Sequence, residues 1–377
     1  MAVSALSQLA DTATCRRLVL KVGSALLVEK GGSLRRAWLQ ALVGEIADAR
    51  SRGQEVVVVS SGAIALGASR LGLGAGGRGN LADAQAAAAV GQIALAGVWA
   101  ELLQARDLVA AQLLLTLDDL EDRRRYLNAS STLARLLERG AVPVVNENDS
   151  VATAEIRFGD NDRLAARVAQ AAGADAVVLL SDVDGLFDRD PQDSAAVLVR
   201  EVHGIDEGVR AMASGASRSG MGSGGMVSKL EAAEIAGRAG IALGIVNGTC
   251  ERPLATAIAA DKGTLFMPQR RDGGRKAWLG GRIAPSGVLT VDAGCADALG
   301  SGSSLLAAGI VDVDGEFARG DLVTIHSARG DRLAQGLVEY NAAECRAIAG
   351  RKAGEQAGLL GYSPRSAVVH RDHMVLL

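Results

Sequence analysis

The stretch Val142-Pro-Val-Val-Asn-Glu-Asn-Asp149 carries the strongest indication of a fold in this chain, because an apolar run ends abruptly in polar side chains. Val142–Val145 is continuously apolar, which is typical of a strand covered on both faces of a sheet. Asn146-Glu147-Asn148-Asp149 follows it directly. In α/β folds ligands bind where parallel strands end, so these carboxylates and amides predict a binding site at that edge.

The same pattern repeats along the first two thirds of the chain, where short apolar runs alternate with longer stretches of helical periodicity. The predicted strands are Leu18–Val22, Glu55–Ser60, Leu108–Leu113, Val142–Val145, Ala176–Leu180 and Ile241–Val246. The predicted helices include Leu34–Ser51, Leu81–Arg106, Asp118–Arg139 and Arg163–Ala172. This alternation predicts an α/β domain over residues 1–267, with a mostly parallel central sheet sandwiched by helices.

The alternation stops after residue 267. Residues 268–283 are expected to form a linker, because Gln269–Lys276 has no apolar periodicity. Short apolar runs separated by turn-forming residues come next: Val288–Val291, Ile310–Val313, Leu322–Ile325, Leu337–Tyr340 and Val368–Val369. A small mixed β-barrel is therefore expected over residues 284–377.

The composition restricts the class of protein. Hydrophobic residues make up 49% and charged residues 22% of the 377 residues, a globular composition. The net charge of -3 argues against a protein that chiefly neutralises nucleic-acid phosphates. Four widely spaced cysteines and four histidines without ligand spacing argue against a disulfide framework or a zinc site, so a reducing cytoplasm is expected. The longest uncharged stretch, Ala84–Ala100, is too short and too polar to span a bilayer and predicts a buried or interface helix.

The glycine-rich patterns of this chain do not indicate a dinucleotide site. Three Gly-x-Gly-x-x-Gly matches begin at Gly72, Gly74 and Gly220, and chance matches are expected among 47 glycines. None follows a predicted strand within a βαβ unit, as the dinucleotide fingerprint requires. The dipeptide Gly-Lys does not occur, so a Walker A loop is absent as well.

Two further strand ends carry groups suited to anions. Lys21-Val22-Gly23-Ser24 closes the first predicted strand with a lysine, and its glycine permits close backbone approach to phosphate oxygens. Ser60-Ser61-Gly62-Ala63-Ile64 supplies small residues with free N–H groups at a helix N-terminus. Each segment also has an ordinary interpretation, as a lysine extending from a strand end or as Ser61 capping a helix.

Two loop segments complete the set. Gly159-Asp160-Asn161-Asp162 adds acidic and amide groups suited to an α-amino group, to lysines or to a metal; the alternative is a solvated acidic loop in which Asp160 caps a helix. Ser219–Lys229 combines glycines that can wrap phosphates with Lys229 in the first turn of a helix. A cation at that end costs helix stability, which favours a bound anion over a flexible linker.

In this order and spacing, LKVGS, VVSSGAIALG, VPVVNENDSVATAEI, FGDND, LLSDVDGLF and SGMGSGGMVSK resemble the amino-acid kinase family, in particular its glutamate 5-kinase members. The region after the linker, ending in AVVHRDHM, resembles a PUA domain. The resemblance covers nearly the whole chain. It implies ATP-dependent phosphorylation of the γ-carboxylate of L-glutamate to L-glutamyl 5-phosphate, the first step of proline biosynthesis. Two departures, Ser24-Ala25 for Thr-Ser and Arg157 for lysine, remove no expected catalytic group.

The resemblance also implies roles for individual residues. The expected catalytic group is Lys21 and Lys229, flanking the transferred phosphoryl group, with Asp162 holding both lysines in place. The expected glutamate site comprises Ser61, Asp149 and Asn161. The expected ATP site comprises Lys21, Ser181, Asp182, Ser223, Gly224, Gly225, Met226, Val227, Ser228 and Lys229. Mg²⁺ is expected to accompany the nucleotide, without a metal site made by the protein alone. Glu155 lies in the segment expected to respond to proline as a feedback inhibitor.

Two groups of alternatives remain open. Another amino-acid kinase would act on aspartate, N-acetylglutamate, a nucleotide or carbamate, although the NENDSVATAE segment and the C-terminal domain favour glutamate. RNA binding through the PUA domain is the second alternative, and its basic residues would be Arg270, Arg271, Arg275, Lys276 and Arg282. An aromatic content of 3% leaves few platforms for base stacking. Apolar helices such as Leu81–Arg106 predict a homo-oligomer, and no membrane association is expected.

Overall fold

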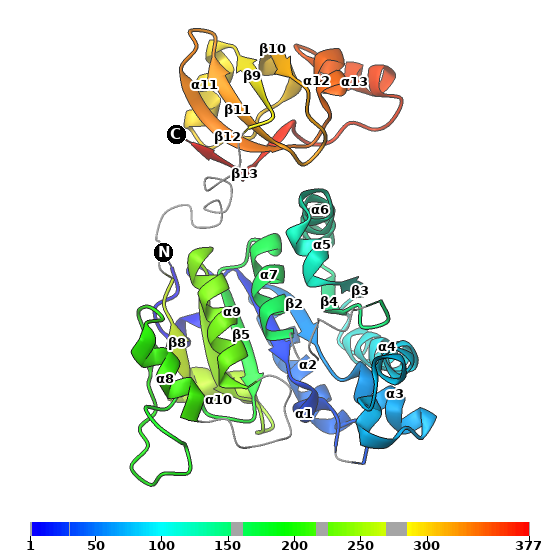
Figure 1. The fold of residues 1–377 in the computed structure, drawn as a ribbon, viewed down its shortest axis with the longest axis vertical. Coiled ribbons are helices and arrows are strands. Elements are labelled where there is room, and N and C mark those ends of the chain that lie inside the picture. Colours follow the sequence, from blue (N-terminus) through cyan, green and yellow to red (C-terminus); the bar gives the residue numbers. More distant parts are fainter. Residues whose placement is uncertain (1, 30, 152–160, 216–224, 269–284, 377) are drawn as a thin grey trace. The chain divides into compact units, whose positions relative to one another are not determined.

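The computed structural model describes residues 2–29, 31–151, 161–215, 225–268 and 285–376, and its elements are labelled in Figure 1. The chain divides into two compact units, each described separately below. Unit 1 comprises Met1–Glu121 and Ala129–Asp272, and unit 2 comprises Asp122–Asn128 and Gly273–Leu377. The predicted linker lies almost wholly outside the described residues, and its bounds stay a prediction.

Unit 1 is built on an eight-stranded sheet with the order β3-β4-β2-β1-β5-β7-β8-β6. The strands are β1 (Arg17–Val22), β2 (Glu55–Ser60), β3 (Ala110–Leu115), β4 (Val142–Glu147), β5 (Ala176–Ser181), β6 (Glu201–Val202), β7 (Ala242–Asn247) and β8 (Thr264–Phe266). The first six strands in the order are parallel, and only β8, with its parallel neighbour β6, runs in the opposite direction. A mostly parallel sheet is therefore confirmed.

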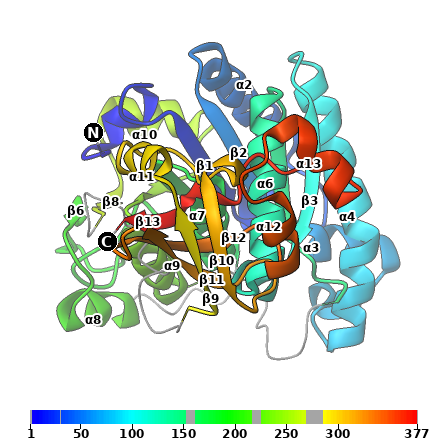
Figure 2. The same cartoon turned by 90° about the horizontal axis from the view of Figure 1, so that it is seen from above.

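Helices cover both faces of this sheet, with α7 and α9 on one face and α2 on the other (Figures 1 and 2). The helices of unit 1 are η1 (Leu6–Ala10), α1 (Ser24–Leu27), α2 (Arg36–Ser51), α3 (Ala63–Leu71), η2 (Gly74–Gly77), α4 (Leu81–Gln104), α5 (Leu117–Glu121), α7 (Asn161–Ala172), α8 (Glu207–Gly215), α9 (Met226–Arg238) and α10 (Pro253–Ala260). Helix α6 (Arg123–Glu138) is divided, with its residues up to Asn128 in unit 2 and those from Ala129 on in unit 1. β4 and β5 are buried along their whole length, as double coverage requires. Their continuous apolar sequences follow from that burial.

The helix predicted over Asp118–Arg139 is wrong as a single element, because the structure has α5 and α6 in its place. The Asp122 side chain accepts a hydrogen bond from the backbone N–H of Arg125 at 2.9 Å. This bond satisfies an N–H that the first turn of a helix cannot pair internally, so α6 begins as a new helix after Asp122.

Helices α3 and α4 pack at very close range through two glycines. A Cβ atom built on Gly67 would overlap the carbonyl oxygen of Ala87, and one on Gly91 would overlap the carbonyl oxygen of Ala63. By length and apolar composition alone α4 could cross a membrane. Its side chains Leu95 and Trp99 are buried in the core of unit 1.

We expect Gly91→Ala and Gly97→Ala, both on α4, to change stability in opposite directions. Gly91→Ala should lower the free energy of unfolding by about 1–3 kcal/mol, because the added methyl group forces α3 and α4 apart. Gly97 has open space around its Cβ position, so alanine there should raise helix stability by about 0.5–1 kcal/mol. Chemical denaturation of both variants measures the two effects; equal destabilisation would contradict the close-packing account.

Unit 2 contains a five-stranded mixed sheet with the order β10-β9-β11-β12-β13, as expected for a separate β-rich domain. Its strands are β9 (Gly287–Val291), β10 (Ile310–Gly315), β11 (Leu322–Ser327), β12 (Arg332–Val338) and β13 (Val369–Leu376). Its helices are α11 (Ala293–Gly300), η4 (Ala307–Gly309), α12 (Ala342–Ile348) and α13 (Ala353–Leu360). β9 and β11 pair in parallel and the other neighbours are antiparallel. The unit has an apolar core of its own.

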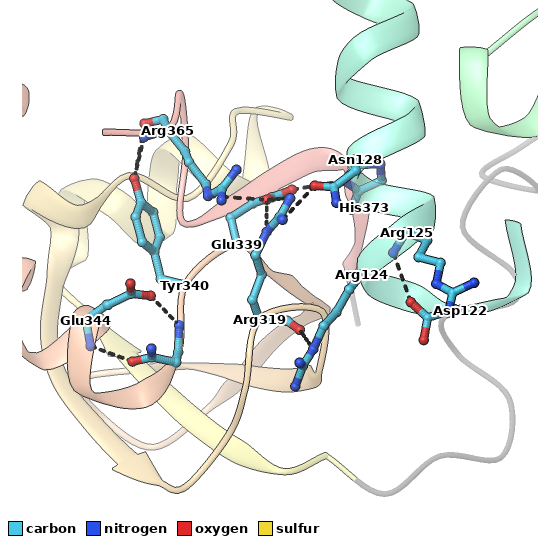
Figure 3. A network of polar contacts seen from close by, with 11 residues as sticks. Asp122, Arg124, Arg125, Asn128, Arg319, Glu339, Tyr340, Glu344, Arg365 and His373 are labelled. Carbon is cyan, nitrogen blue, oxygen red and sulfur yellow. Dashed lines mark hydrogen bonds and ion pairs between the residues drawn. The ribbon is translucent and has the colours of Figure 1, made fainter. Parts of the chain in front are cut away.

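A polar network within unit 2 surrounds the buried carboxylate of Glu339 (Figure 3). Arg319 donates to Glu339 Oε2 through Nη2 at 3.0 Å and through Nε at 3.1 Å, and its Nη1 donates to Asn128 at 2.7 Å.

The strand predicted over Leu337–Tyr340 is wrong at its end, since β12 stops at Val338. Asn341 instead forms a capping box with Glu344 that begins α12.

Candidate active site

One cavity of unit 1 lies where the carboxyl ends of four central strands meet. β1 contributes Lys21, β4 leads into Asp149, and β5 ends in Ser181. The turn after β2 contributes Ser61, whose backbone N–H donates to the carbonyl oxygen of Val22 at 3.1 Å. The charged and amide residues of the cavity wall are Lys21, Arg78, Asn146, Glu147, Asp149, Asn161, Asp182 and Lys229.

Two lysines share one buried carboxylate in this cavity. Lys21 Nζ lies 2.6 Å from Asp162 Oδ1, and Lys229 Nζ lies 2.9 Å from Asp162 Oδ2. All three side chains are buried, and Asp162 has no exposed surface at all. Asp162 stands in the first turn of α7, which packs beside α9 and over β1, so the fold brings both lysines to it.

The electrostatics of this trio favour an anionic ligand. Burial alone would raise the pKa of Asp162, but the charges of Lys21 and Lys229 outweigh it and hold the pKa at about 2. Burial lowers the pKa of Lys21, and the charge of Asp162 opposes that shift. Two ammonium groups around one carboxylate leave a net charge of +1. In a site with little water, that charge attracts phosphate or carboxylate oxygens more strongly than it would in bulk solvent.

The backbone beside the lysines leaves room for such an anion. A Cβ atom on Gly23 would lie 3.9 Å from Lys21 Nζ, so its absence keeps the space next to the ammonium group open. α9 begins at Met226 after Gly225, whose position at the N-cap brings no side-chain hydrogen bond to the helix end. Lys229 is in the first turn of α9, as predicted.

A chain of amide groups fixes the other half of the cavity. Asn146 Nδ2 donates to Gln92 Oε1 at 2.8 Å, while Asn146 Oδ1 accepts from Asn161 Nδ2 at 3.1 Å. Asn161 Nδ2 also donates to Ser61 Oγ at 2.7 Å. Both hydrogens of the Asn161 amide are therefore used, and its buried Oδ1 has no hydrogen-bond donor among the residues that the structure describes. A buried acceptor without a donor is costly, so a ligand with an N–H group would stabilise it.

Asp149 is the acidic group of this half. Burial raises the pKa of Asp149 to about 6, and the positive charge of Arg78 opposes the shift. At neutral pH the carboxylate is mostly ionised, yet it carries no full complement of water. A ligand ammonium group would relieve that desolvation, because opposite charges stabilise each other at close range.

The structure brings the predicted site residues together where it describes them. Lys21, Ser61, Asp149, Asn161, Ser181, Asp182 and Lys229 all line the cavity, and Asp162 lies between the lysines. Ser228 Oγ lies 3.0 Å from Asp162 Oδ2, and Gly225, Met226 and Val227 lead into it at the start of α9. Ser223, Gly224, Glu155, Arg157 and Asp160 lie outside the described residues.

Sequence reasoning missed two residues of the site. Gln92 lies in the middle of α4 and meets Asn146 only through the packing of α4. Arg78 stands in the glycine-rich stretch after η2, where no strand end or motif marks it. A charged side chain isolated among glycines was the one available signal for Arg78.

A mostly parallel α/β sheet whose carboxyl edge carries a cavity lined by two lysines suits an enzyme that transfers a phosphoryl group. The model of the "Amino acid kinase family" matches residues 16–247, and the model of the "PUA domain" matches residues 287–357. The chain belongs to the amino acid kinase family and carries a C-terminal PUA domain, so the predicted family and fold class are confirmed. Membership of this kinase family implies ATP as the phosphoryl donor.

Three curated relatives match almost the whole chain, and each is named glutamate 5-kinase. The protein of Novosphingobium aromaticivorans is 63% identical and covers 100% of both chains. The protein of Sphingopyxis alaskensis is 59% identical, over 97% of this chain and 98% of its own. The protein of Zymomonas mobilis is 53% identical, over 96% of this chain and 92% of its own.

Proposed function

We propose that this chain transfers the γ-phosphoryl group of ATP to the γ-carboxylate of L-glutamate, the first step of proline biosynthesis. The products are ADP and L-glutamyl 5-phosphate. The observation that carries the proposal is the lysine–Asp162–lysine trio beside an acidic and amide-lined pocket. Its two halves match the two substrates: anionic phosphates on one side, and an amino acid with an ammonium group on the other.

The chemistry of this reaction agrees with the residues of the cavity. A γ-carboxylate with a pKa near 4.3 is about 500:1 ionised at pH 7, so it is already a nucleophile and needs no general base. One of its oxygens forms a bond to the γ-phosphorus, and the bond from that phosphorus to the β–γ bridging oxygen breaks. ADP leaves with the electron pair. The remaining task for the protein is to hold two anions together and to stabilise the charge that develops between them.

Lys21 and Lys229 are proposed to flank the transferred group, one from each side of Asp162. Asp162 is proposed to act as a positioning residue, because both of its oxygens are already paired with the lysines. On the acceptor side, Asp149 and the unpaired Oδ1 of Asn161 would receive the α-ammonium group. Ser61, whose oxygen already accepts from Asn161, keeps its own hydrogen to donate to a substrate carboxylate.

The nucleotide is proposed to lie over the ends of β5 and β7. Ser181 and Asp182 would contact it there, together with the N-terminal turn of α9 from Gly225 to Lys229; Ser223 and Gly224 join them by resemblance. Mg²⁺ is proposed to accompany the nucleotide and to offset the charge of its phosphates. The described residues contain no cluster of three or more carboxylate, histidine or cysteine ligands, so nucleotide oxygens and water would hold most of the ion.

The proposal is tested by measuring ADP release with separate acceptors: L-glutamate, L-aspartate, N-acetyl-L-glutamate, UMP and carbamate. We expect turnover with L-glutamate, and its dependence on added Mg²⁺ tests the proposed ion. Turnover with a different acceptor would keep the kinase family and overturn the substrate.

We expect kcat/KM for L-glutamate to fall as the pH drops below about 6, because the raised pKa of Asp149 lets its carboxylate take up a proton there. The protonated form no longer balances the α-ammonium group of the substrate. The γ-carboxylate of glutamate itself titrates lower, near 4.3, so the two events are separable. A pH profile of kcat/KM measures the effect, and a profile flat down to about pH 5 would contradict the role of Asp149.

Asp149→Asn provides the matched control for this pH dependence. A carboxyl group with a raised folded-state pKa destabilises the fold as the pH rises from about 4 to about 6, and the loss is complete above that range. The variant should therefore bind glutamate poorly at neutral pH, yet unfold with a free energy higher by up to about 3 kcal/mol. Titration calorimetry and chemical denaturation test the two halves of this expectation.

RNA binding through the PUA domain is the second candidate function, favoured by the PUA match over residues 287–357. PUA domains elsewhere often bind RNA. The basic residues expected to contribute, from Arg270 to Arg282, lie outside the described residues. A gel-shift assay without salt-sensitive binding of structured RNA would dismiss this function.

Three further properties are proposed on the resemblance and on the surface of the chain. Proline is proposed to inhibit the enzyme through the segment around Glu155, and activity unchanged by millimolar proline would refute this.

A homo-oligomer is proposed because Ile93 on α4 is 77% exposed and Leu114 on the edge strand β3 is 38% exposed; light scattering measures the mass. A cytoplasmic location agrees with cysteines that are free thiols, and cell fractionation tests it.

A further inference from the structure

Glutamate bound for γ-phosphorylation presents three charged groups, and the residues discussed so far account for two of them. The γ-carboxylate lies with the phosphates near Lys21 and Lys229, and the α-ammonium group faces Asp149. The α-carboxylate has no cationic partner among these residues. Burying an anion without such a partner is expensive, so a third cation is expected on the acceptor side of the cavity.

Arg78 is the remaining cation on the described part of the cavity wall. Among the described residues it forms no hydrogen bond or ion pair, whereas both lysines are committed to Asp162. Its guanidinium group has five N–H donors in a planar fork, which matches the two oxygens of a carboxylate. Arg78 is therefore free to bind a substrate anion.

The fold delivers Arg78 to the acceptor half of the cavity. β2 and β4 are neighbours in the sheet, and the turns after them carry Ser61 and Asp149. Arg78 follows η2, which packs against α3, the helix that follows β2. Arg78 and Asp149 line the same cavity, and the positive charge of Arg78 opposes the raised pKa of Asp149.

The backbone next to Arg78 is held in place because Gly77 packs closely between two helices. Gly77 is buried and has φ +76°, and a Cβ atom there would lie 2.8 Å from Ala68 Cβ and 3.2 Å from Ala87 Cβ. Ala68 belongs to α3 and Ala87 to α4. The residue before Arg78 is thus clamped between two core helices, so Arg78 projects from a fixed point although its side chain is exposed.

We propose that Arg78 binds the α-carboxylate of the acceptor amino acid and makes the enzyme selective for α-amino acids whose α-carboxyl group is free. Arg78 then binds the α-carboxylate and Asp149 binds the α-ammonium group, so each charged group on the α-carbon has a partner of opposite charge. This inference rests on the proposed function. It adds a specificity-determining residue that the strand-end segments do not contain.

The test compares L-glutamate with its α-amide, which keeps the γ-carboxylate and the α-ammonium group but lacks the α-carboxylate charge. Wild-type enzyme should prefer L-glutamate in kcat/KM. A charge-assisted hydrogen bond typically supports about 10- to 100-fold discrimination. In Arg78→Gln that preference should collapse by about the same factor, through a higher KM for glutamate. The KM for ATP should stay unchanged, because the nucleotide lies on the other side of the lysines.

Two companion variants sharpen the result. Arg78→Lys keeps the charge and should recover part of the preference for glutamate. Arg70→Gln removes an exposed arginine from the last turn of α3, outside the cavity wall, and should leave the preference intact. In Arg78→Gln the pH inflection assigned to Asp149 should also move upward, because the opposing positive charge is gone. That shift reports the proximity of Arg78 to Asp149, whereas the preference for glutamate over its α-amide reports binding of the α-carboxylate.

The possible outcomes separate this inference from the proposed function. An unchanged preference for glutamate in Arg78→Gln overturns the role of Arg78 and leaves glutamate phosphorylation standing. Wild-type enzyme that fails to phosphorylate glutamate overturns the proposed function first, before any variant is made, and the inference with it.

Discussion

Lys229→Ala is expected to lower kcat by about 10²–10³ while leaving the chain folded. Lys229 Nζ lies 2.9 Å from Asp162 and belongs to the first turn of α9, where the proposed nucleotide phosphates would meet the helix end. Its charge is required mainly when negative charge spreads over the transferred phosphoryl group. The loss should therefore appear in kcat more than in the KM for glutamate.

The fold should survive this substitution because Asp162 retains Lys21 at 2.6 Å and the hydroxyl group of Ser228 at 3.0 Å. Lys262→Ala is the matched control in unit 1, since that lysine is exposed and pairs with Asp184 at 2.8 Å. An exposed pair contributes about 0–1 kcal/mol to stability. Steady-state kinetics and thermal unfolding of both variants measure the contrast, and an unchanged kcat in Lys229→Ala would exclude the proposed role.

Asp162→Asn is expected to have the largest effect on stability of any single change in the site. Asp162 is fully buried and is the shared counterion of two buried lysines. Removing one partner of a buried charge pair typically costs about 3–5 kcal/mol, because the other charge remains without compensation. Activity should fall with it, since neither lysine would be held at the phosphoryl group.

The free energy of unfolding of Asp162→Asn should also depend on pH, because the buried lysine charges are no longer compensated. Burial already lowers the pKa of Lys21, and Asp162 opposes that shift; without Asp162 the folded-state pKa of Lys21 should fall further below the unfolded value. The unfolded chain then binds more protons than the folded one, and the free energy of unfolding should rise with pH above neutrality.

A double variant distinguishes charge repulsion from lost packing. Asp162→Asn combined with Lys229→Met removes one of the two uncompensated charges and should recover part of the lost stability, without recovering activity. Denaturation of the single and double variants completes the cycle. A single Asp162→Asn variant as stable as the wild type would mean that the ion pairs contribute nothing to the fold.

The central strands of the α/β unit could be predicted from the sequence, because they are buried on both faces and therefore form continuous apolar runs. Glu55–Ser60 matches β2 residue for residue, and Val142–Val145 lies within β4. β6 and β8 were missed, since two and three residues are too short to establish a periodicity. The break between α5 and α6 depends on a single side-chain bond from Asp122, which apolar periodicity does not register.

Some residues of the site could be predicted from the sequence and others could not. Residues at strand ends, such as Lys21 and Asp149, were predicted because parallel strands end at a common edge. Arg78 reaches the cavity from the loop after η2, and Gln92 of α4 supports the cavity residue Asn146; only tertiary packing brings both side chains there. The raised pKa of Asp149 likewise follows from burial in the folded cavity, which no sequence pattern encodes.

The most direct test of the central claim is an isotope transfer with L-glutamate labelled by oxygen-18 in both γ-carboxylate oxygens. Enzyme, ATP, Mg²⁺ and hydroxylamine are combined, and the inorganic phosphate is analysed by mass spectrometry. If the γ-carboxylate attacks the γ-phosphorus, its oxygen becomes the bridge of the acyl phosphate. Hydroxylamine then attacks the carbonyl carbon, giving the γ-hydroxamate and phosphate that carries one labelled oxygen. Phosphate free of label, released with ADP, would contradict the account, because the phosphoryl group would then have gone to a different acceptor.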